Sequence, residues 1–336
     1  MSRYDRQIKL DAVGAEGQQK LQNASVLIVG VGGLGCPAAM YLAGAGVGKI
    51  GLMDHDKVDI TNLHRQVLYT EQDLGKPKAE AAKTNLQQRN CEVNFEVFTE
   101  PLTIDNAEAI FKNYDVILDG TDNFETKYLI NDAAVLTGKP WVYASIYKNE
   151  GQLSVFNYQD GPSYRCVFPK TTRQNVSCEA TGVLGVLPGI LGMLQAAEVL
   201  KIILGQGEVL SGKLKLINMM QASEQVINIW RKPEEIERVK REGIIPVRID
   251  CALNDKSRFY MDVREVFEQP KPEGNILNIP LGELANRHAE IPKTDAVFVF
   301  CQSGKRSAAA VELLKSKYGF SNVKNVEGGI ETIIDG

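Results

Sequence analysis

A single thiol stands near the carboxyl end of the chain, where an apolar run meets an alanine-rich run. In FVFCQSGKRSAAAVELL, residues 298–314, four residues separate Cys301 from Arg306. At a turn from a strand into a helix, successive backbone N–H groups point at the sulfur. The helix N-terminus and the nearby cation further lower the cost of an anion. The pattern therefore predicts a reactive thiolate or persulfide.

Two other interpretations of this thiol were weighed. A buried packing cysteine would not need a cationic loop, so this interpretation is the weaker one. A thiolate in a cradle of N–H groups also attacks phosphate, as in phosphatases. That chemistry usually has a longer spacing between the cysteine and the arginine, and the smaller ring around Cys301 suits a single sulfur better.

A glycine-rich turn near the amino end has the spacing of a nucleotide-binding loop. In VLIVGVGGLG, Gly30, Gly32 and Gly35 form G-x-G-x-x-G, and Gly33 lies inside the turn. Glycines keep the turn tight and let backbone N–H groups approach a phosphate at the N-terminus of the next helix. Asp54 ends the second apolar run about twenty residues later, where an acid accepts hydrogen bonds from a ribose. The motif alone does not separate NAD, FAD and ATP.

Charged residues further along favour a triphosphate. Arg65 and Lys78 follow Asp54, and Asp122 follows the fourth apolar run in DGTDN. Because the carboxyl ends of parallel strands share one edge of a sheet, Asp54 and Asp122 should converge there. A triphosphate needs cations to neutralise it and a carboxylate to hold Mg²⁺. Each cation taken singly would be a solvated surface charge, but together with the loop they predict ATP and Mg²⁺ as ligands.

The elements that must position these residues follow an α/β pattern. The near-continuous apolar runs SVLIVG, KIGLMD, VNFEVF, DVILD and WVYAS predict strands covered on both faces, with helices between them. After Ser145 the runs GQLSVF, KLKLIN and QVINIW follow without regular crossover helices, around a long apolar helix at about 188–204. We expect a Rossmann-like, mostly parallel sheet with an antiparallel extension.

Charge and periodicity then divide the chain. The stretch RKPEEIERVKREGIIP, residues 231–246, is highly charged and predicts a solvated linker or a linking helix. A second, smaller α/β pattern begins near Cys251, with RFYMDV, ILNIP, AVFVF and NVKNV as short strands. The expected segments are a nucleotide-binding domain at 1–230, a charged linker at 231–250 and a small α/β domain at 251–336.

Composition excludes several classes of function. The chain has 336 residues, 44% of them hydrophobic and 24% charged, and a net charge of -4 without a separate basic run. These values predict no nucleic-acid footprint. No apolar stretch is expected to reach membrane-spanning length, and the charged N-terminus has no apolar signal core. The six cysteines form no C-x-x-C pair, which favours free thiols in a cytoplasmic protein: Cys36, Cys91, Cys166, Cys178, Cys251 and Cys301.

From Ser2 to about Trp230 the sequence resembles the ubiquitin-activating-type adenylyltransferases, in particular the bacterial MoeB/ThiF group. The resemblance is carried in order by RYDRQI, GVGGLG, DHDKVDITNLHRQ, GKPKAEAA, DGTDN and SCEATGVLGVLPGILG. It implies a homodimeric enzyme that uses Mg-ATP to adenylate the C-terminal Gly-Gly carboxylate of a ubiquitin-like sulfur-carrier protein. An ionised carboxylate needs no general base, so the histidines His55 and His64 are assigned no role.

The same resemblance assigns the site residues. Asp54 is similar to the ribose ligand, with Asp56 beside it, and Asp122 is similar to the magnesium carboxylate. Arg6 matches the arginine that reaches the ATP of the partner subunit. The resemblance implies a phosphate-handling group of Asn62, Arg65, Gln66 and Lys78.

Two cysteine positions depart from the family or stay open. Many relatives hold a structural zinc with two C-x-x-C pairs, but here SYRC has Ser163 before Cys166 and the second pair is missing. One thiolate cannot close a tetrahedral site, so we predict no zinc and expect packing to hold this region. Cys178 matches the thioester cysteine of the activating enzymes. It is interpreted either as a thiol that accepts acyl or sulfur groups or as a loop cysteine.

The tail resembles a rhodanese, through YMDVREVFE, ILNIPLGEL, VFCQSGKRSAAAVELL and NVKNVEGGIE. That likeness makes Cys301 a persulfide carrier, supplied by a donor such as a cysteine desulfurase. It implies that Asp262 and Arg264 are structural or lie near the loop. The family's Gly-His-Ile segment is replaced by QPKPEGNIL, so the domain is abbreviated. The expected sequence of steps is adenylation, attack by the Cys301 persulfide, and release of a thiocarboxylate by another thiol, for which Cys178 is a candidate.

Three alternatives remain at this point. The first keeps adenylation but forms a thioester at Cys178 for protein conjugation, with a non-catalytic rhodanese-like domain. The second is a nicotinamide-dependent oxidoreductase, which the glycine loop alone allows and the cations near Asp54 disfavour. The third is a regulatory module in which one domain has lost its activity. Neither the carrier nor the pathway that the sulfur serves can be named from the sequence.

Overall fold

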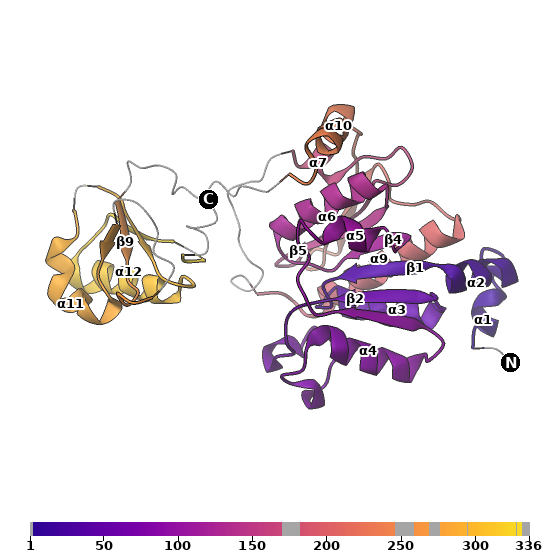
Figure 1. The fold of residues 1–336 in the computed structure, drawn as a ribbon, viewed down its shortest axis with the longest axis horizontal. Helices are drawn as coiled ribbons and strands as arrows, with labels where there is room; N and C mark the ends of the chain where they lie inside the picture. The colour runs from indigo at the N-terminus through magenta and orange to yellow at the C-terminus, as the bar shows by residue number, and fades with distance from the viewer. Residues whose placement is uncertain are drawn as a thin grey trace. The chain divides into compact units, whose positions relative to one another are not determined.

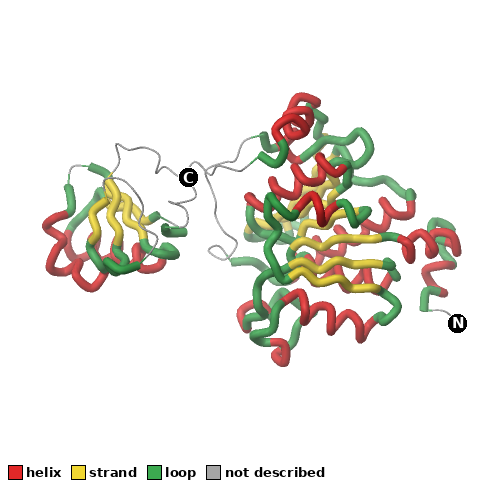
Figure 2. The backbone as a smooth tube through the Cα atoms, in the orientation of Figure 1, coloured by secondary structure: helices red, strands yellow, loops and turns green. Residues whose placement is uncertain are grey.

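The structure is a computed structural model that divides into two compact units, Met1–Val247 and Arg248–Gly336. Each unit is considered by itself (Figures 1 and 2). Cys178 and Cys251 lie outside the residues that the structure describes. The described residues are 3–169, 182–245, 259–268, 276–293, 295–326 and 328–330.

The first unit is built on an eight-stranded sheet in the order β3-β2-β1-β4-β5-β6-β7-β8. The strands from β3 to β5 run parallel, and β6, β7 and β8 are added antiparallel. The predicted mostly parallel sheet with an antiparallel extension is therefore confirmed. The strands are β1 (Ser25–Val29), β2 (Lys49–Met53), β3 (Asn94–Phe98), β4 (Val116–Asp119), β5 (Trp141–Tyr147), β6 (Glu150–Phe156), β7 (Lys213–Asn218) and β8 (Ser223–Asn228).

Helices cover both faces of the parallel part, as the near-continuous apolar runs predict. Val26 and Ile28 of β1 pack with α3, α4 and α9, while Leu27 and Val29 pack with α5 and α6 on the other face. The helices are α1 (Asp5–Ile8), α2 (Gly14–Asn23), α3 (Gly35–Ala45), α4 (Lys78–Arg89), α5 (Ala107–Phe111), α6 (Phe124–Thr137), α7 (Tyr164–Val167), α9 (Val186–Leu204) and α10 (Pro233–Glu242), with short 3₁₀ turns at Ile60–Asn62 and Glu71–Asp73.

Helix α9 corrects one expectation from the sequence. It has 19 residues and is long and apolar enough, by length and composition, to cross a membrane, whereas no such stretch was expected. Leu187, Leu191 and Val199 are buried in the core of the first unit, where the helix lies against α3, β5 and β6. A helix that fills the space between a sheet and another helix is apolar around much of its surface, which accounts for its composition.

Helix α10 lies in the stretch whose charge suggested a solvated linker or a linking helix. Its Ile236 and Val239 are buried against Val135 of α6 and Cys166 of α7. The charged residues of α10 occupy the opposite side, as expected for an amphipathic surface helix. The compact first unit accordingly extends to Val247.

The second unit has a four-stranded, all-parallel sheet in the order β10-β9-β11-β12. Met261, Val299 and Leu314 belong to its buried core. This agrees with the predicted small α/β domain. Its elements are β9 (Phe259–Asp262), β10 (Ile276–Asn278), α11 (Leu284–Arg287), β11 (Val297–Phe300), α12 (Lys305–Tyr318) and β12 (Val323–Asn325), with 3₁₀ turns at Leu281–Glu283 and His288–Glu290.

Candidate active site

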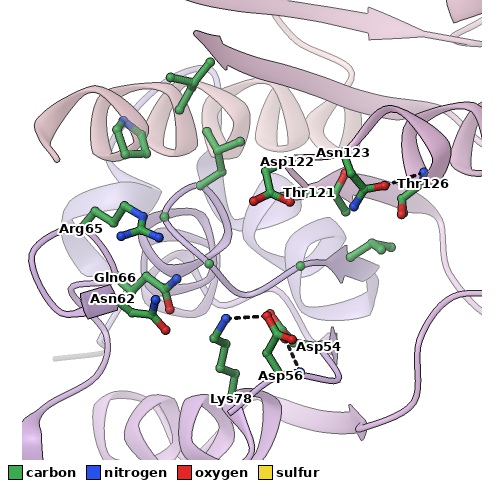
Figure 3. A pocket seen from close by; sticks show the side chains of 18 of the residues that line it. Asp54, Asp56, Asn62, Arg65, Gln66, Lys78, Thr121, Asp122, Asn123 and Thr126 are labelled. Atoms are coloured by element: carbon green, nitrogen blue, oxygen red, sulfur yellow. Dashed lines mark hydrogen bonds and ion pairs between the residues drawn. The ribbon is translucent and has the colours of Figure 1, made fainter. Parts of the chain in front are cut away.

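A cleft of about 720 Å³ opens at the carboxyl ends of the parallel strands of the first unit (Figure 3). The glycine turn after β1 forms its floor, and the loops after β2 and β4 form two of its walls. Asp54 and Asp122 both line it, as expected for strand ends that share one edge of a sheet. In Figure 3, Asp122 lies across the glycine turn from Lys78.

The backbone explains two of the glycines in the turn. Gly30 has φ +88°, and a Cβ there would stand 2.8 Å from the carbonyl of Gly120 in the loop after β4. A Cβ on Gly35, at the start of α3, would stand 2.0 Å from the carbonyl oxygen of Gly30. Gly32 and Gly33 instead line the cleft, and the nearest atom to a Cβ on Gly32 is 3.6 Å away. The turn therefore leaves room for a phosphate beside backbone N–H groups.

Asp54 ties the end of β2 to the glycine turn. Its Oδ2 accepts the N–H of Val31 at 2.8 Å, and its Oδ1 accepts the N–H of Asp56 at 3.0 Å. Burial raises the pKa of Asp54 above its ordinary value, because this effect outweighs the attraction of Lys78. A carboxylate held in this way has lone pairs left for the hydroxyl groups of a ribose.

Lys78, the first residue of α4, is the most buried cation of the cleft. Its Nζ donates to Oδ2 of Asp56 at 2.9 Å, and its side chain is only 8% exposed. Burial alone would raise the pKa of Asp56, but the hydrogen bond and charge of Lys78 outweigh it and lower that pKa. An anionic ligand in the cleft would compete with Asp56 for the ammonium group.

The remaining phosphate candidates come from the 3₁₀ turn and the residues after it. Asn62, Arg65 and Gln66 line the same wall of the cleft (Figure 3). Arg65 donates to the carbonyl of Thr61 at 2.9 Å and lies 2.8 Å from Nε2 of His64. The carbonyl Oε1 of Gln66 is buried without a hydrogen-bond partner among the described residues. Because an amide oxygen only accepts hydrogen bonds, it would pair with a donor of a nucleotide, such as a hydroxyl or amino group. The Nε2 of Gln66, 3.6 Å from where a Cβ on Gly32 would stand, is the donor that a phosphate would need.

The sequence analysis gave His64 no role, and the structure places this residue in the wall of the cleft. The histidine lines the cleft beside Arg65 and helps to orient the guanidinium group. The sequence gives no signal for this contact. Whether His64 reaches the guanidinium group of Arg65 depends on the conformation of the turn that holds both residues.

Arg6 lies away from the cleft of its own chain. The preceding Tyr4 accepts a hydrogen bond from Asn90 at 2.8 Å and packs beside Gly46, at the C-terminal ends of α4 and α3. These helix ends lie near α1, at the amino edge of the sheet (Figure 1), whereas the residues that line the cleft lie at the carboxyl edge. Arg6 is exposed there and is not among the residues that line the cleft. A role at a nucleotide would therefore require a second copy of the chain.

The structure shows the surroundings of Cys166, the position at which the resemblance raised the question of a structural zinc. The Cys166 sulfur accepts the backbone N–H groups of Ser163 at 3.3 Å and Lys232 at 3.2 Å. Among the described residues, the one group of metal-ligating side chains close enough to share an ion is Asp54, His55 and Asp56 in the cleft. The sulfur therefore accepts two backbone hydrogen bonds, and the absence of zinc stays a prediction from the missing cysteines.

A buried ion pair fastens this region, in addition to the packing that the sequence suggested. Arg165 of α7 donates to both carboxylate oxygens of Asp132 of α6 at 2.7 Å, and both side chains are buried. Asp132 also accepts the N–H of Ile245, and Arg165 donates to the carbonyl of Ile245, each at 3.0 Å. The pair joins three segments that are distant in sequence.

An Arg165→Met variant should lose about 3–5 kcal/mol of unfolding free energy, because it leaves the buried Asp132 carboxylate without its cation. A chelator such as EDTA should leave the stability of the unaltered protein unchanged. Urea denaturation measures both effects. Lys112→Met, which removes an exposed pair with Glu108, is the control and should cost less than about 1 kcal/mol. A large loss of stability on chelation would contradict this interpretation.

In the second unit, Cys301 lies at the turn between β11 and α12, as expected, and its thiol is buried. Burial by itself raises the pKa of Cys301, but hydrogen bonds from the Ser307 hydroxyl and from the N–H groups of Ser307, Ser303 and Arg306 outweigh it. The pKa of Cys301 is therefore below its ordinary value. The Ser307 Oγ lies 3.4 Å from the sulfur. These donors favour a thiolate or a persulfide anion.

The guanidinium group of Arg306 has a different partner from the one that the sequence suggested. It donates to both oxygens of Glu268, at 2.6 and 2.8 Å, and this pairing lowers the pKa of Glu268 to about 2. The anion at Cys301 is thus favoured chiefly by hydroxyl and backbone donors. The role of Glu268 was missed, because thirty-eight residues separate it from Arg306 in sequence.

A Ser307→Ala variant should raise the pKa of Cys301 and slow its alkylation by iodoacetamide near pH 7. The reason is that removal of a donor destabilises the thiolate, so the rise of rate with pH moves to higher pH. Ser303→Ala is the matched control, since Ser303 contributes its backbone N–H, which alanine keeps. Identical rate profiles for the two variants would show that the hydroxyl group has no part in stabilising the anion.

Comparisons with known proteins agree with both sites. The ThiF family matches residues 4–239, and the rhodanese-like domain matches residues 248–335. The chain is 48% identical over 240 residues to the sulfur carrier protein adenylyltransferase of Thermus thermophilus, covering 69% of this chain and 89% of that protein. It is 49% identical to the adenylyltransferase and sulfurtransferase MOCS3 of Anopheles gambiae, covering 98% of this chain and 86% of that protein.

A solved structure shares the fold of the first unit. The crystal structure of E. coli MccB with ATP has a TM-score of 0.61 and 26% identity, over 69% of this chain and 73% of that one. With the glycine turn, the strand-end acids and the cysteine loop in their expected elements, the resemblance seen in the sequence is confirmed. The chain belongs to the ThiF family and carries a rhodanese-like domain at its carboxyl end.

Proposed function

We propose that the chain uses Mg-ATP to adenylate the C-terminal Gly-Gly carboxylate of a ubiquitin-like sulfur-carrier protein and then converts it to a thiocarboxylate with sulfur from Cys301. The observation that carries the proposal is the cleft in which Lys78, Arg65 and Asp122 surround the glycine turn. The printed names of the two relatives, an adenylyltransferase of a sulfur carrier and an adenylyltransferase with sulfurtransferase activity, support the same pairing of reactions.

In the first step the ionised carboxylate attacks the α-phosphorus of ATP, and pyrophosphate leaves. Two anions approach each other, so the step depends on cations aimed at the developing charge rather than on a general base. Lys78 and Arg65 supply positive charge from two walls of the cleft. Asp122, exposed at the carboxyl edge of the sheet, would hold Mg²⁺, which neutralises phosphate oxygens when bound.

In the second step the terminal sulfur of a Cys301 persulfide attacks the carrier's acyl carbon, and AMP leaves. The product is an acyl disulfide between the carrier and Cys301. A second thiolate then attacks the Cys301 sulfur, the sulfur–sulfur bond breaks, and the carrier leaves as a thiocarboxylate. Cys178 is the candidate for this thiolate, and an external dithiol reduces the resulting disulfide. A persulfide donor such as a cysteine desulfurase reloads Cys301.

The position of Arg6 supports a homodimer. Because it lies at the edge of the sheet opposite its own cleft, it serves catalysis only if it reaches the nucleotide of a second copy. We place the protein in the cytoplasm, where a reducing environment keeps such thiols available.

Mass spectrometry of the carrier tests the proposal. The protein is mixed with ATP, a persulfide donor and candidate carriers that end in Gly-Gly, and the carrier is weighed over time. An acyl-adenylate followed by a thiocarboxylate is expected. A carrier that accumulates instead as a thioester on Cys178 would favour protein conjugation, and nicotinamide-dependent absorbance changes would favour an oxidoreductase.

A further inference from the structure

Lys127 of α6 is a buried cation beneath the cleft that the proposed chemistry does not use. Lys127 is only 2% exposed, and its ammonium group makes three hydrogen bonds. It donates to Oδ2 of Asp119 at 2.8 Å and to the carbonyl oxygens of Thr121 and Ala144, each at 2.9 Å. All three donors of the ammonium group are therefore used within the protein.

The two carbonyl groups belong to the neighbouring segments that follow the paired ends of β4 and β5. Thr121 directly precedes Asp122 in the loop after β4, and Ala144 directly precedes Ser145 in β5. Both Asp122 and Ser145 line the cleft. One ammonium group thus holds the backbone immediately before a lining residue in each of these two segments.

The strands themselves do not fix this spacing. The ladder between β4 and β5 consists of two residue pairs and ends at Leu118↔Val142, although β5 continues to Tyr147. Beyond that point, side chains take the place of ladder hydrogen bonds. Gln195 of α9 makes a second tie, because its Nε2 donates to the carbonyl oxygens of Asp119 at 2.7 Å and Val142 at 3.0 Å.

Hydrogen bonds within the loop after β4 also fix its conformation. Oδ1 of Asp119 accepts the N–H of Thr121 at 2.9 Å and its hydroxyl group at 2.6 Å, while Oδ2 pairs with Lys127. Asn123 closes the loop by accepting the N–H of Thr126 at the start of α6. Asp122, by contrast, is exposed to the cleft, so its direction depends on the residues on either side.

We propose that Lys127, assisted by Gln195, is a positioning residue that sets the distance and direction of Asp122 relative to β5, and thereby the affinity of the cleft for the Mg²⁺ of Mg-ATP. This inference rests on the proposed role of Asp122. The cation does not touch the nucleotide. It acts through the carbonyl groups of Thr121 and Ala144, which lose their common donor when Lys127 is replaced.

The test is the Mg²⁺ dependence of carrier-dependent ATP–pyrophosphate exchange in the full chain. Lys127→Met should raise the Mg²⁺ concentration for half-maximal exchange about tenfold, and Lys127→Arg, which restores a cation with several donors, should bring it back to within about threefold. Gln195→Leu should cause a smaller rise in the same direction. Gln195→Leu provides a second test in case Lys127→Met does not fold. It removes only the hydrogen bonds of Nε2, because Oε1 of Gln195 has no hydrogen-bond partner among the described residues.

Arg165→Met is the matched control, because it breaks another buried ion pair of α6 on the side away from the cleft. It should reduce the amount of folded protein without moving the half-maximal Mg²⁺ concentration. An equal Mg²⁺ dependence in Lys127→Met, Gln195→Leu and Arg165→Met would overturn the positioning role alone. Exchange by the unaltered protein that needs no Mg²⁺ would overturn the role proposed for Asp122, and the inference with it.

Discussion

A Lys78→Met variant is expected to lose about two to three orders of magnitude of carrier-dependent ATP–pyrophosphate exchange. Lys78 is the most buried cation of the cleft, with a side chain that is 8% exposed, so its charge acts where water screens it least. Methionine keeps most of the side-chain volume and removes the charge. The loss should appear mainly in the maximal rate, because the ammonium group faces charge that develops in the transition state.

Lys76→Met is the control for this variant. Lys76 lies two residues earlier, and its half-exposed side chain pairs with Asp73 rather than with a residue of the cleft. Its exchange rate should stay within about twofold of the unaltered protein, as expected for the loss of an exposed ion pair. Similar rates for the two variants would mean that Lys78 is not aimed at the reacting phosphate.

A Cys301→Ser variant is expected to form no thiocarboxylate above background while it keeps its rate of ATP–pyrophosphate exchange. A serine hydroxyl group cannot carry a sulfane sulfur. The described residues that line the adenylation cleft belong to the first unit. Mass spectrometry of the carrier should show the acyl-adenylate accumulating.

Cys91→Ser is the matched control for loss of a thiol. Cys91 is a free, exposed cysteine of the first unit, outside the cleft. Both reactions should proceed normally in this variant. If Cys301→Ser lost exchange as well, the division of labour between the two units would be wrong.

The parts of the fold that could be predicted are those with a local signal. Continuous apolar runs such as residues 25–29 predicted strands covered on both faces, because a parallel sheet buries both sides of each strand. The spacing of Gly30 and Gly35 predicted the tight turn. Asp54 and Asp122 each stand at the carboxyl end of a predicted parallel strand, which predicted that they would share one edge of the sheet. The structure places these residues around one cleft.

The parts that could not be predicted depend on partners that are distant in sequence. A lysine inside a helix normally faces solvent, and nothing in the sequence shows that Lys127 fills the gap where β4 and β5 stop pairing. The charge of residues 231–246 suggested a solvated linker or a linking helix, and the burial of two apolar side chains of α10 against α6 and α7 could not be predicted from that charged run. In the sequence Glu268 has the pattern of a surface acid, and its pairing with Arg306 becomes visible only in the folded second unit.

The products of ATP give the most direct test of the claim that the cleft of the first unit activates a carboxylate. The full chain is incubated with Mg-ATP and a carrier ending in Gly-Gly, in parallel with the same carrier bearing an amidated C-terminus. We predict pyrophosphate and the acyl-adenylate of the carrier, which yields AMP on hydrolysis, with the free carboxylate, and no turnover with the amide. Release of ADP and phosphate, or equal turnover with both carriers, would contradict an attack by the carrier's carboxylate on the α-phosphorus.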